Sequence, residues 1–84
     1  MRLDKFLKVS RLIKRRTVAK EVSDAGKITV NGRPAKASTD VKVGDRLVLS
    51  FANREVEVEI LLVAETMKAD LAKDMYNVVR ETAK

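Results

Sequence analysis

The stretch KITVNGRPA, residues 27–35, carries the clearest structural signal in this chain of 84 residues. Ile28 and Val30 alternate with polar residues, which is the pattern of a strand with one buried face. Asn31-Gly32 follows directly and supplies the positive φ angles of a tight two-residue turn. The stretch therefore predicts a strand that ends in a tight turn, and the sequence on either side indicates what packs against it.

The chain begins with a short amphipathic pattern. In residues 2–9, Leu3, Phe6 and Leu7 have the i, i+3, i+4 spacing of a narrow apolar helix face. Basic residues occupy the opposite side of the same helical wheel. This segment predicts a short helix with one face toward the core and one cationic face toward solvent.

A second helix is predicted from about residue 17 to residue 25. Thr17 is its expected N-cap, because a hydroxyl can accept a hydrogen bond from a free helical N–H. Gly26 is its expected left-handed stop. Lys20 lies in the first turn of this helix, where a positive charge opposes the helix dipole. Lys20 is thus unfavourable for the helix itself, but its charge would attract a bound polyanion.

Two more strands are predicted after the tight turn, in VKVGDRLVLSF (residues 41–51) and EVEVEILLV (residues 55–63). Apolar and polar residues alternate in both, and the second strand carries glutamates on its outer face, so the two strands predict a hairpin with one apolar face. Residues 68–82 return to an i, i+4, i+7, i+8 spacing of Leu71, Met75, Val78 and Val79 and predict a C-terminal helix.

These patterns predict an α+β fold in which two N-terminal helices pack on a small antiparallel sheet of four or five short strands, followed by a C-terminal helix. We expect a single domain over residues 1–84. Residues 1–51 would form its core, residues 52–67 would hold the last strands of the sheet, and residues 68–84 the C-terminal helix.

The composition argues against catalysis. The chain has no Cys and no His, so the commonest general base and the commonest metal ligands are missing. Its serines have no His to activate them, and its three glycines do not form a phosphate-binding loop. We expect a protein that is not an enzyme and that uses no cofactor or metal. No apolar run approaches the ~20 residues of a membrane span, and the start of the chain is not a signal peptide.

The charge is concentrated in one half of the chain. Residues 1–36 hold eleven basic and three acidic residues, a net charge of +8, whereas the remainder holds seven basic and nine acidic residues, a net charge of −2. Lys14, Arg15 and Arg16 are consecutive, and such repulsion weakens a small domain unless an anion neutralises it. Arginine suits bidentate phosphate contacts, and free N–H groups at the start of the second helix would assist.

Three kinds of anionic partner could neutralise this charge: a membrane surface, an acidic protein and a nucleic acid. The apolar stripe of the first helix is narrow and needed for the core, which argues against a membrane role. No long recognition helix is spaced to read a DNA major groove, whereas basic and small residues suit the backbone and shape recognition of structured RNA. An interaction module for an acidic protein and a regulator or assembly factor on another structured RNA stay open as alternatives.

The segments RLDKFLKVSRLIKRRTVAKEVSDAGKITVNGRPAK (residues 2–36) and DVKVGDRLVL (residues 40–49) resemble the S-four-type, or αL, RNA-binding domain. This resemblance covers residues 1 to about 51. MRLDKFLKVSRLIKRRT at residues 1–17 and DMY at residues 74–76 further resemble the stand-alone bacterial RqcP and heat-shock-protein-fifteen family. The resemblance implies the αL RNA-binding motif, two helices packed on a small sheet.

The resemblance also implies a role in ribosome-associated quality control. Such proteins bind large ribosomal subunits that carry an obstructed peptidyl-tRNA, contact ribosomal RNA and tRNA, and support alanine tailing with an RqcH-type factor. We therefore expect a cytoplasmic, ribosome-associated monomer. The candidate RNA-binding residues, from the charge pattern and the motif match together, are Arg2, Asp4, Lys5, Lys8, Arg11, Lys14, Arg15, Arg16, Thr17, Lys20, Lys27 and Arg33. For Asp4, orienting neighbouring arginines or capping the first helix is weighed against a direct bond to RNA.

Overall fold

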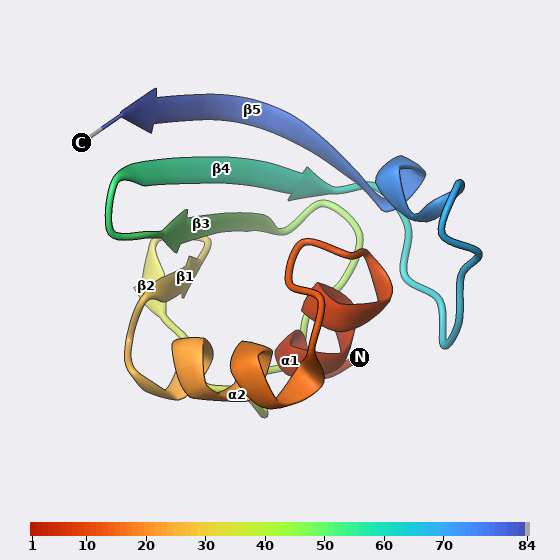
Figure 1. The fold of residues 1–84 in the computed structure, drawn as a ribbon, viewed down its shortest axis with the longest axis horizontal. Helices are drawn as coiled ribbons and strands as arrows, with labels where there is room; N and C mark the ends of the chain where they lie inside the picture. The colour runs from red at the N-terminus through yellow and green to blue at the C-terminus, as the bar shows by residue number, and fades with distance from the viewer. Residues whose placement is uncertain (84) are drawn as a thin grey trace.

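The computed structural model describes residues 1–83. Two helices precede the sheet, and a short 3-10 helix precedes its last strand (Figure 1). The elements are α1 (Leu3–Val9), α2 (Arg16–Asp24), β1 (Ile28–Val30), β2 (Arg33–Pro34), β3 (Arg46–Ser50), β4 (Arg54–Ile60), η1 (Ala72–Met75) and β5 (Tyr76–Ala83). The five strands form one antiparallel sheet in the order β2-β1-β3-β4-β5. No helix within residues 1–83 is long and apolar enough to span a membrane.

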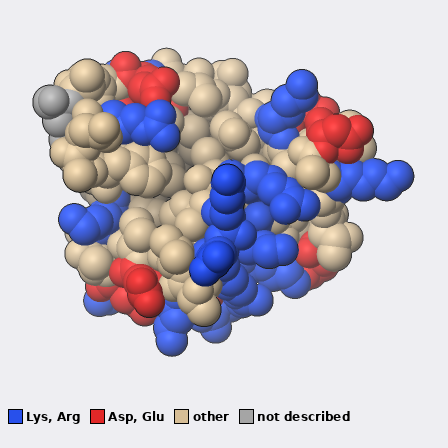
Figure 2. Space-filling view, in the orientation of Figure 1, with Lys and Arg blue, Asp and Glu red and all other residues tan. Residues whose placement is uncertain are grey.

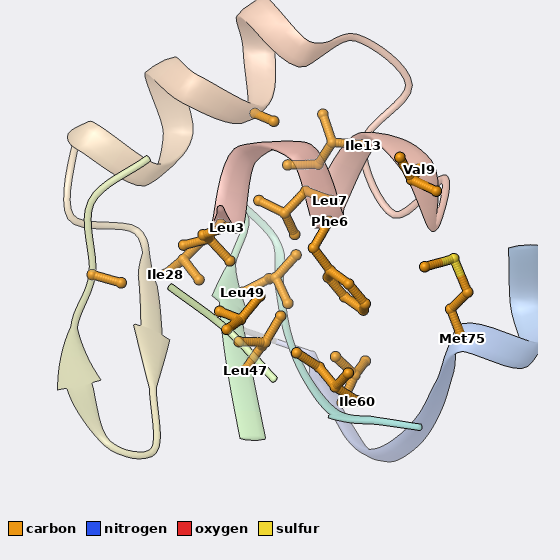
Figure 3. Close-up of a cluster of buried hydrophobic side chains, with 14 of the residues drawn as sticks. Leu3, Phe6, Leu7, Val9, Ile13, Ile28, Leu47, Leu49, Ile60 and Met75 are labelled. Carbon is orange, nitrogen blue, oxygen red and sulfur yellow. The ribbon is translucent and has the colours of Figure 1, made fainter. Parts of the chain in front are cut away.

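The core lies between the two helices and one face of the sheet (Figure 3). Leu3, Phe6 and Leu7, the apolar positions predicted for the first helix, have no exposed surface. They meet the alternating side chains of β3 and β4, among which Leu47 and Ile60 are also fully buried. Burying a side chain of this size contributes about 1.5–3 kcal/mol, so this contact fixes the helices on the sheet.

The predicted Asn31-Gly32 turn is confirmed and joins β1 to β2, and the predicted hairpin of the two later strands is confirmed by the antiparallel pairing of β3 with β4. Val30 pairs with Arg33 across a two-residue turn, and Asn31 and Gly32 have φ angles of 52° and 83°. The turn is tied to the turn at Val43–Gly44, because the Asn31 side chain donates to Asp45 Oδ1 at 3.1 Å. Asp45 Oδ2 accepts from the backbone N–H of Lys42 at 3.0 Å, and Asn31 Oδ1 accepts from that of Arg46 at 2.9 Å. Asn31 and Asp45 thus join two turns.

The predicted N-cap of the second helix is wrong by two residues. The N-cap is Arg15, in an extended conformation, and no side chain of the described residues caps α2. Thr17 lies inside the first turn and is exposed. The predicted stop is correct, since Gly26 has a left-handed φ of 79°.

The predicted C-terminal helix is also wrong. Only η1 is helical in this part of the described chain, and residues 76–83 form the edge strand β5, paired along the whole length of β4. The spacing that suggested a helix includes Val78 and Val79, whose branched side chains favour a strand once a partner edge is available. A β-bulge explains the misleading spacing, because Val79 has no partner in a register that pairs Val58 with Val78 and Glu57 with Arg80.

Candidate nucleic-acid interface

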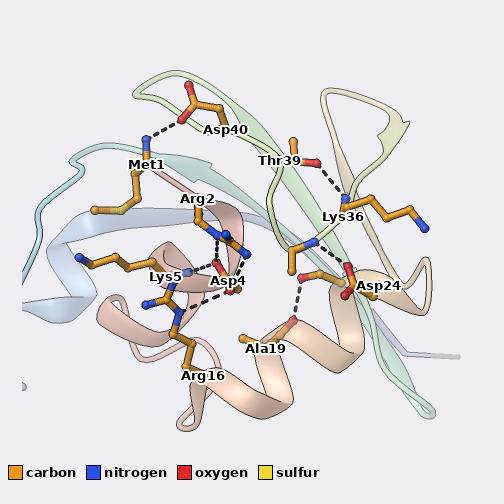
Figure 4. A network of polar contacts seen from close by, with 12 residues as sticks. Met1, Arg2, Asp4, Lys5, Arg16, Ala19, Asp24, Lys36, Thr39 and Asp40 are labelled. Carbon is orange, nitrogen blue, oxygen red and sulfur yellow. Dashed lines mark hydrogen bonds and ion pairs between the residues drawn. The ribbon is translucent and has the colours of Figure 1, made fainter.

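A buried aspartate organises the cationic surface (Figure 4). Asp4 is 3% exposed, and its Oδ1 accepts from Arg2 Nε at 3.2 Å and from the backbone N–H of Lys5 at 2.8 Å. Its Oδ2 accepts from Arg16 Nε at 3.4 Å and from Arg2 Nη2 at 3.5 Å. We call Asp4, Arg2 and Arg16 the Asp4 cluster. It joins the start of α1 to the start of α2.

The cluster holds a charged carboxylate. Burial of Asp4 opposes ionisation, but the hydrogen bonds from Arg2 and Arg16 outweigh it and lower the pKa of Asp4 below its ordinary value. The Arg2 and Arg16 side chains stay 51% and 49% exposed. Arg16 is held through Nε alone, so both of its Nη groups are free of partners within residues 1–83. Such an arginine is oriented in advance for a bidentate phosphate contact.

This geometry supports the orienting role that was one of the two interpretations of Asp4. Asp4 fulfils the capping role only in part. It accepts a hydrogen bond from the backbone N–H of Lys5, but the N-cap position of α1 is Arg2, which makes no side-chain cap bond. Both carboxylate oxygens are already occupied by protein donors.

The segment between the helices, residues 11–15, is the basic loop. Arg11, Lys14 and Arg15 are exposed in it, and Arg15 directly precedes Arg16 of the Asp4 cluster. Arg11 has a φ of 65°, a left-handed conformation that costs a non-glycine residue of order 1 kcal/mol. The first turn of α2 contains no acidic residue and no side-chain cap, so its free N–H groups add to the positive potential.

The remaining predicted residues divide into two groups. Lys8, Thr17 and Lys20 are exposed on α1 and α2. Lys27 and Arg33, also exposed, follow the other end of α2, which is nine residues long and so about 13 Å from end to end. The structure therefore brings most of the predicted residues together and sets these two apart.

Lys5 has a partner that local sequence patterns could not reveal. Its ammonium group forms an ion pair with the exposed Glu65, sixty residues away along the chain. The hydrogen bond and charge of Lys5 lower the pKa of the Glu65 carboxyl. Lys5 is thus neutralised by a neighbour, whereas the basic side chains of the loop form no ion pair within residues 1–83.

The outer face of the sheet differs from the face over the helices. Glu57 lies between two arginines, with 3.2 Å separating its carboxylate oxygens from Arg46 Nη1 and from Arg80 Nη2. Figure 2 shows basic side chains gathered over the helices. Within residues 1–83, the two arginines beside Glu57 are therefore paired, whereas the basic side chains of the loop are not.

Comparison with known proteins agrees with this geometry. A family model for the S4 domain matches residues 1–47. The chain is 56% identical over 81 residues to the RQC P-site tRNA stabilizing factor of Bacillus subtilis, and the match covers 96% of this chain and 94% of that relative. It is 60% identical over 81 residues to the protein of the same name from Halalkalibacterium halodurans, with 96% and 92% of the two chains covered.

The solved structures extend the likeness to the fold. Heat shock protein 15 from Vibrio cholerae, solved as a trimer, superimposes with a TM-score of 0.85 and 30% identity. The match covers 94% of this chain and 81% of that one. The resemblance that the sequence suggested is therefore confirmed. On its fold and its sequence, the chain belongs to the S4 domain family, in the branch that contains the RQC P-site tRNA stabilizing factors and heat shock protein 15.

Proposed function

We propose that this chain binds structured RNA through the Asp4 cluster and the basic loop, and that it holds P-site tRNA on the ribosome during ribosome-associated quality control. One observation carries the proposal: a buried carboxylate fixes Arg2 and Arg16 beside the basic loop, which makes a phosphate-binding surface assembled in advance. The names of relatives that are 56% and 60% identical over nearly the whole chain support the same assignment.

The finer proposal follows from the family. The chain binds large ribosomal subunits that carry an obstructed peptidyl-tRNA and touches both ribosomal RNA and the tRNA. It supports alanine tailing by an RqcH-type factor and does so as a monomer in the cytoplasm. Its contribution is positional rather than catalytic: it holds the tRNA and the subunit in one geometry. Alanine tails made by this chain without another protein factor would contradict that view.

The decisive test removes two cations from the proposed interface. Arg15→Ala combined with Arg16→Ala should weaken co-sedimentation with large ribosomal subunits at least 100-fold, because each charge-assisted contact contributes roughly 1.5–3 kcal/mol. The slope of log affinity against log salt should flatten by about 0.7–0.9 for each phosphate that the variant no longer binds. The thermal melt of Arg15→Ala alone should stay close to that of the wild type, because this side chain is exposed and forms no ion pair within residues 1–83. Arg16→Ala removes a donor to the buried Asp4 carboxylate and should lower the melting temperature, so binding is compared at a temperature where the double variant is folded.

The structure supplies a matched control. Arg46→Ala combined with Arg80→Ala removes the same net charge from the outer face of the sheet. This control should sediment like the wild type. If both double variants lose binding equally, the effect is one of net charge alone and the proposed interface is wrong. Ribonuclease treatment separates the runner-up, since a partnership with an acidic protein would survive it.

A further inference from the structure

A shallow groove of about 180 Å³ lies beside the basic loop, between Leu12 and the core side of β4 and β5. Leu49 and Val56, both buried, form part of its lining. Val78 points to the core side of the sheet, opposite Val58, yet it is 49% exposed because no helix of the described chain reaches over this end. The groove is thus a part of the core face that residues 1–83 leave uncovered.

The rim of the groove is polar but balanced in charge. Arg54 Nη1 donates to Glu81 Oε1 at 2.9 Å, and both residues line the groove. The Arg54 guanidinium lies 5.3 Å from the centre of the Phe51 ring, within the range of a cation–π contact. An occupant with an aromatic face and hydrogen-bonding edges would find an apolar surface, a stacking partner, a donor and an acceptor here.

The groove and the basic loop share one piece of backbone. Leu12, which lines the groove, lies between the exposed Arg11 and Lys14 in the chain. In Figure 2 an uncharged hollow separates the gathered basic side chains from the charged pair on the strands above. A phosphate backbone held by the loop would therefore bring its own bases to the mouth of the groove.

We propose that the groove takes one unpaired nucleobase of the RNA whose backbone lies on the basic loop. The inference rests on the proposed function and specifies it further. The volume admits one flat ring system or one side chain, and at ~30 Å³ for each water it is far larger than a hydration site. Charge favours the nucleobase over an apolar side chain of a protein, because the adjoining loop attracts phosphate. Stacking of unpaired bases on aromatic and arginine side chains is a common mode of RNA recognition.

The first test compares two adjacent valines on β5. Val78→Glu puts a carboxylate into the groove, whereas Val79→Glu, at the bulge and outside the groove lining, adds the same charge one residue away. Both positions are exposed, so both variants should fold. With an RNA hairpin that has an unpaired loop, we expect Val78→Glu to weaken binding about tenfold more than Val79→Glu does. With a blunt duplex of the same stem, the two variants should bind alike.

The second test reports occupancy directly. The chain contains no Trp, so Phe51→Trp introduces a single indole into the groove. The hairpin RNA should quench its emission by stacking, and the blunt duplex should not. Phe51→Leu, which keeps an apolar side chain without an aromatic face, should bind the hairpin more weakly and melt near the wild-type temperature.

The outcomes distinguish this inference from the proposed function. If the wild type binds neither RNA nor large subunits, the proposed function fails. If Val78→Glu and Val79→Glu bind the hairpin equally, and the indole emission is unchanged by RNA, the groove proposal is wrong while the phosphate-binding surface stands. An indole signal that appears with whole subunits and persists after ribonuclease treatment would assign the groove to a protein side chain instead.

Discussion

The two most informative aspartates of this chain, Asp4 and Asp45, share an environment and differ in what they hold. They are 3% and 5% exposed, and in both, hydrogen bonds outweigh the cost of burial and lower the pKa. Asp45 accepts hydrogen bonds from the Asn31 side chain and from the backbone of a turn, and its Oδ1 lies 3.6 Å from the Lys42 ammonium. Asp4 binds two arginines whose side chains are about half exposed.

The difference separates folding from function. The two hydrogen bonds that Asp45 accepts at 3.1 and 3.0 Å come from an amide side chain and a backbone N–H, and they join two turns. Its one cationic neighbour within the described residues, Lys42, belongs to the same turn and lies farther away, at 3.6 Å. The partners of Asp4 turn their remaining donors toward solvent. The desolvation cost of burying the Asp4 carboxylate is offset if the arginines that it orients bind a ligand in a fixed geometry.

The largest effect that this comparison predicts is on RNA affinity. Asp4→Asn should weaken binding to large ribosomal subunits about tenfold, because two arginines must then be immobilised on binding at roughly 0.5–1.5 kcal/mol each. Asp45→Asn should leave affinity unchanged at a temperature where both variants are folded. Sedimentation of the two variants side by side tests the contrast, and equal loss in both would erase the functional distinction.

The next effect is on stability. Asp45→Asn should lower the free energy of unfolding by about 1–3 kcal/mol, because it replaces a charged acceptor that two N–H donors share. For a domain of this size that corresponds to a melting temperature lower by roughly 4–8 °C per kcal/mol. Asn31→Ala should act in the same direction, and the double variant should be less destabilised than the sum, since the two residues contact each other. Additive losses would indicate that the two turns are not joined.

Protonation of both aspartates should destabilise the fold at acid pH. Their folded-state pKa values are lowered from the ordinary 3.8, so the folded chain binds fewer protons than the unfolded chain in this range. Their contribution is therefore fully present above pH 3.8 and is lost as the pH falls through the folded-state values. Melts from neutral pH downward should show the wild type converging on Asp4→Asn and Asp45→Asn. A constant gap between them at low pH would contradict the assignment.

The smallest effect concerns the exposed pair of Lys5 and Glu65. Glu65→Gln frees the Lys5 ammonium for phosphate, so RNA affinity should rise about two- to threefold at low salt. The gain should vanish at high salt, where exposed charges are screened. Glu59→Gln, on the outer face of the sheet, is the control with the same change of charge and should have no effect.

Local sequence patterns predicted the two N-terminal helices, the Asn31-Gly32 turn and the cationic half of the chain, because each depends on residues that are neighbours in the chain. They failed where the structure depends on a residue or strand far away in the chain. The edge strand β5 exists because β4 offers it a free edge, and Glu65 neutralises Lys5 across sixty residues. The groove is formed by the loop after α1 and the last strand, so no spacing in the sequence signals it. For Asp4 the sequence left two roles open, and only the placement of both arginines supports the orienting one.

The bulge at Val79 has a consequence for self-association. A sheet edge with free N–H and C=O groups is a template for the same edge of another copy. The β2 edge is only two residues long and contains Pro34, which has no N–H to donate. The longer β5 edge is interrupted by the bulge and carries Arg80 and Glu81 beside it. Each sheet edge therefore has its own feature that disfavours pairing with the sheet of a second copy: a short strand with a proline at β2, and a bulge with flanking charges at β5.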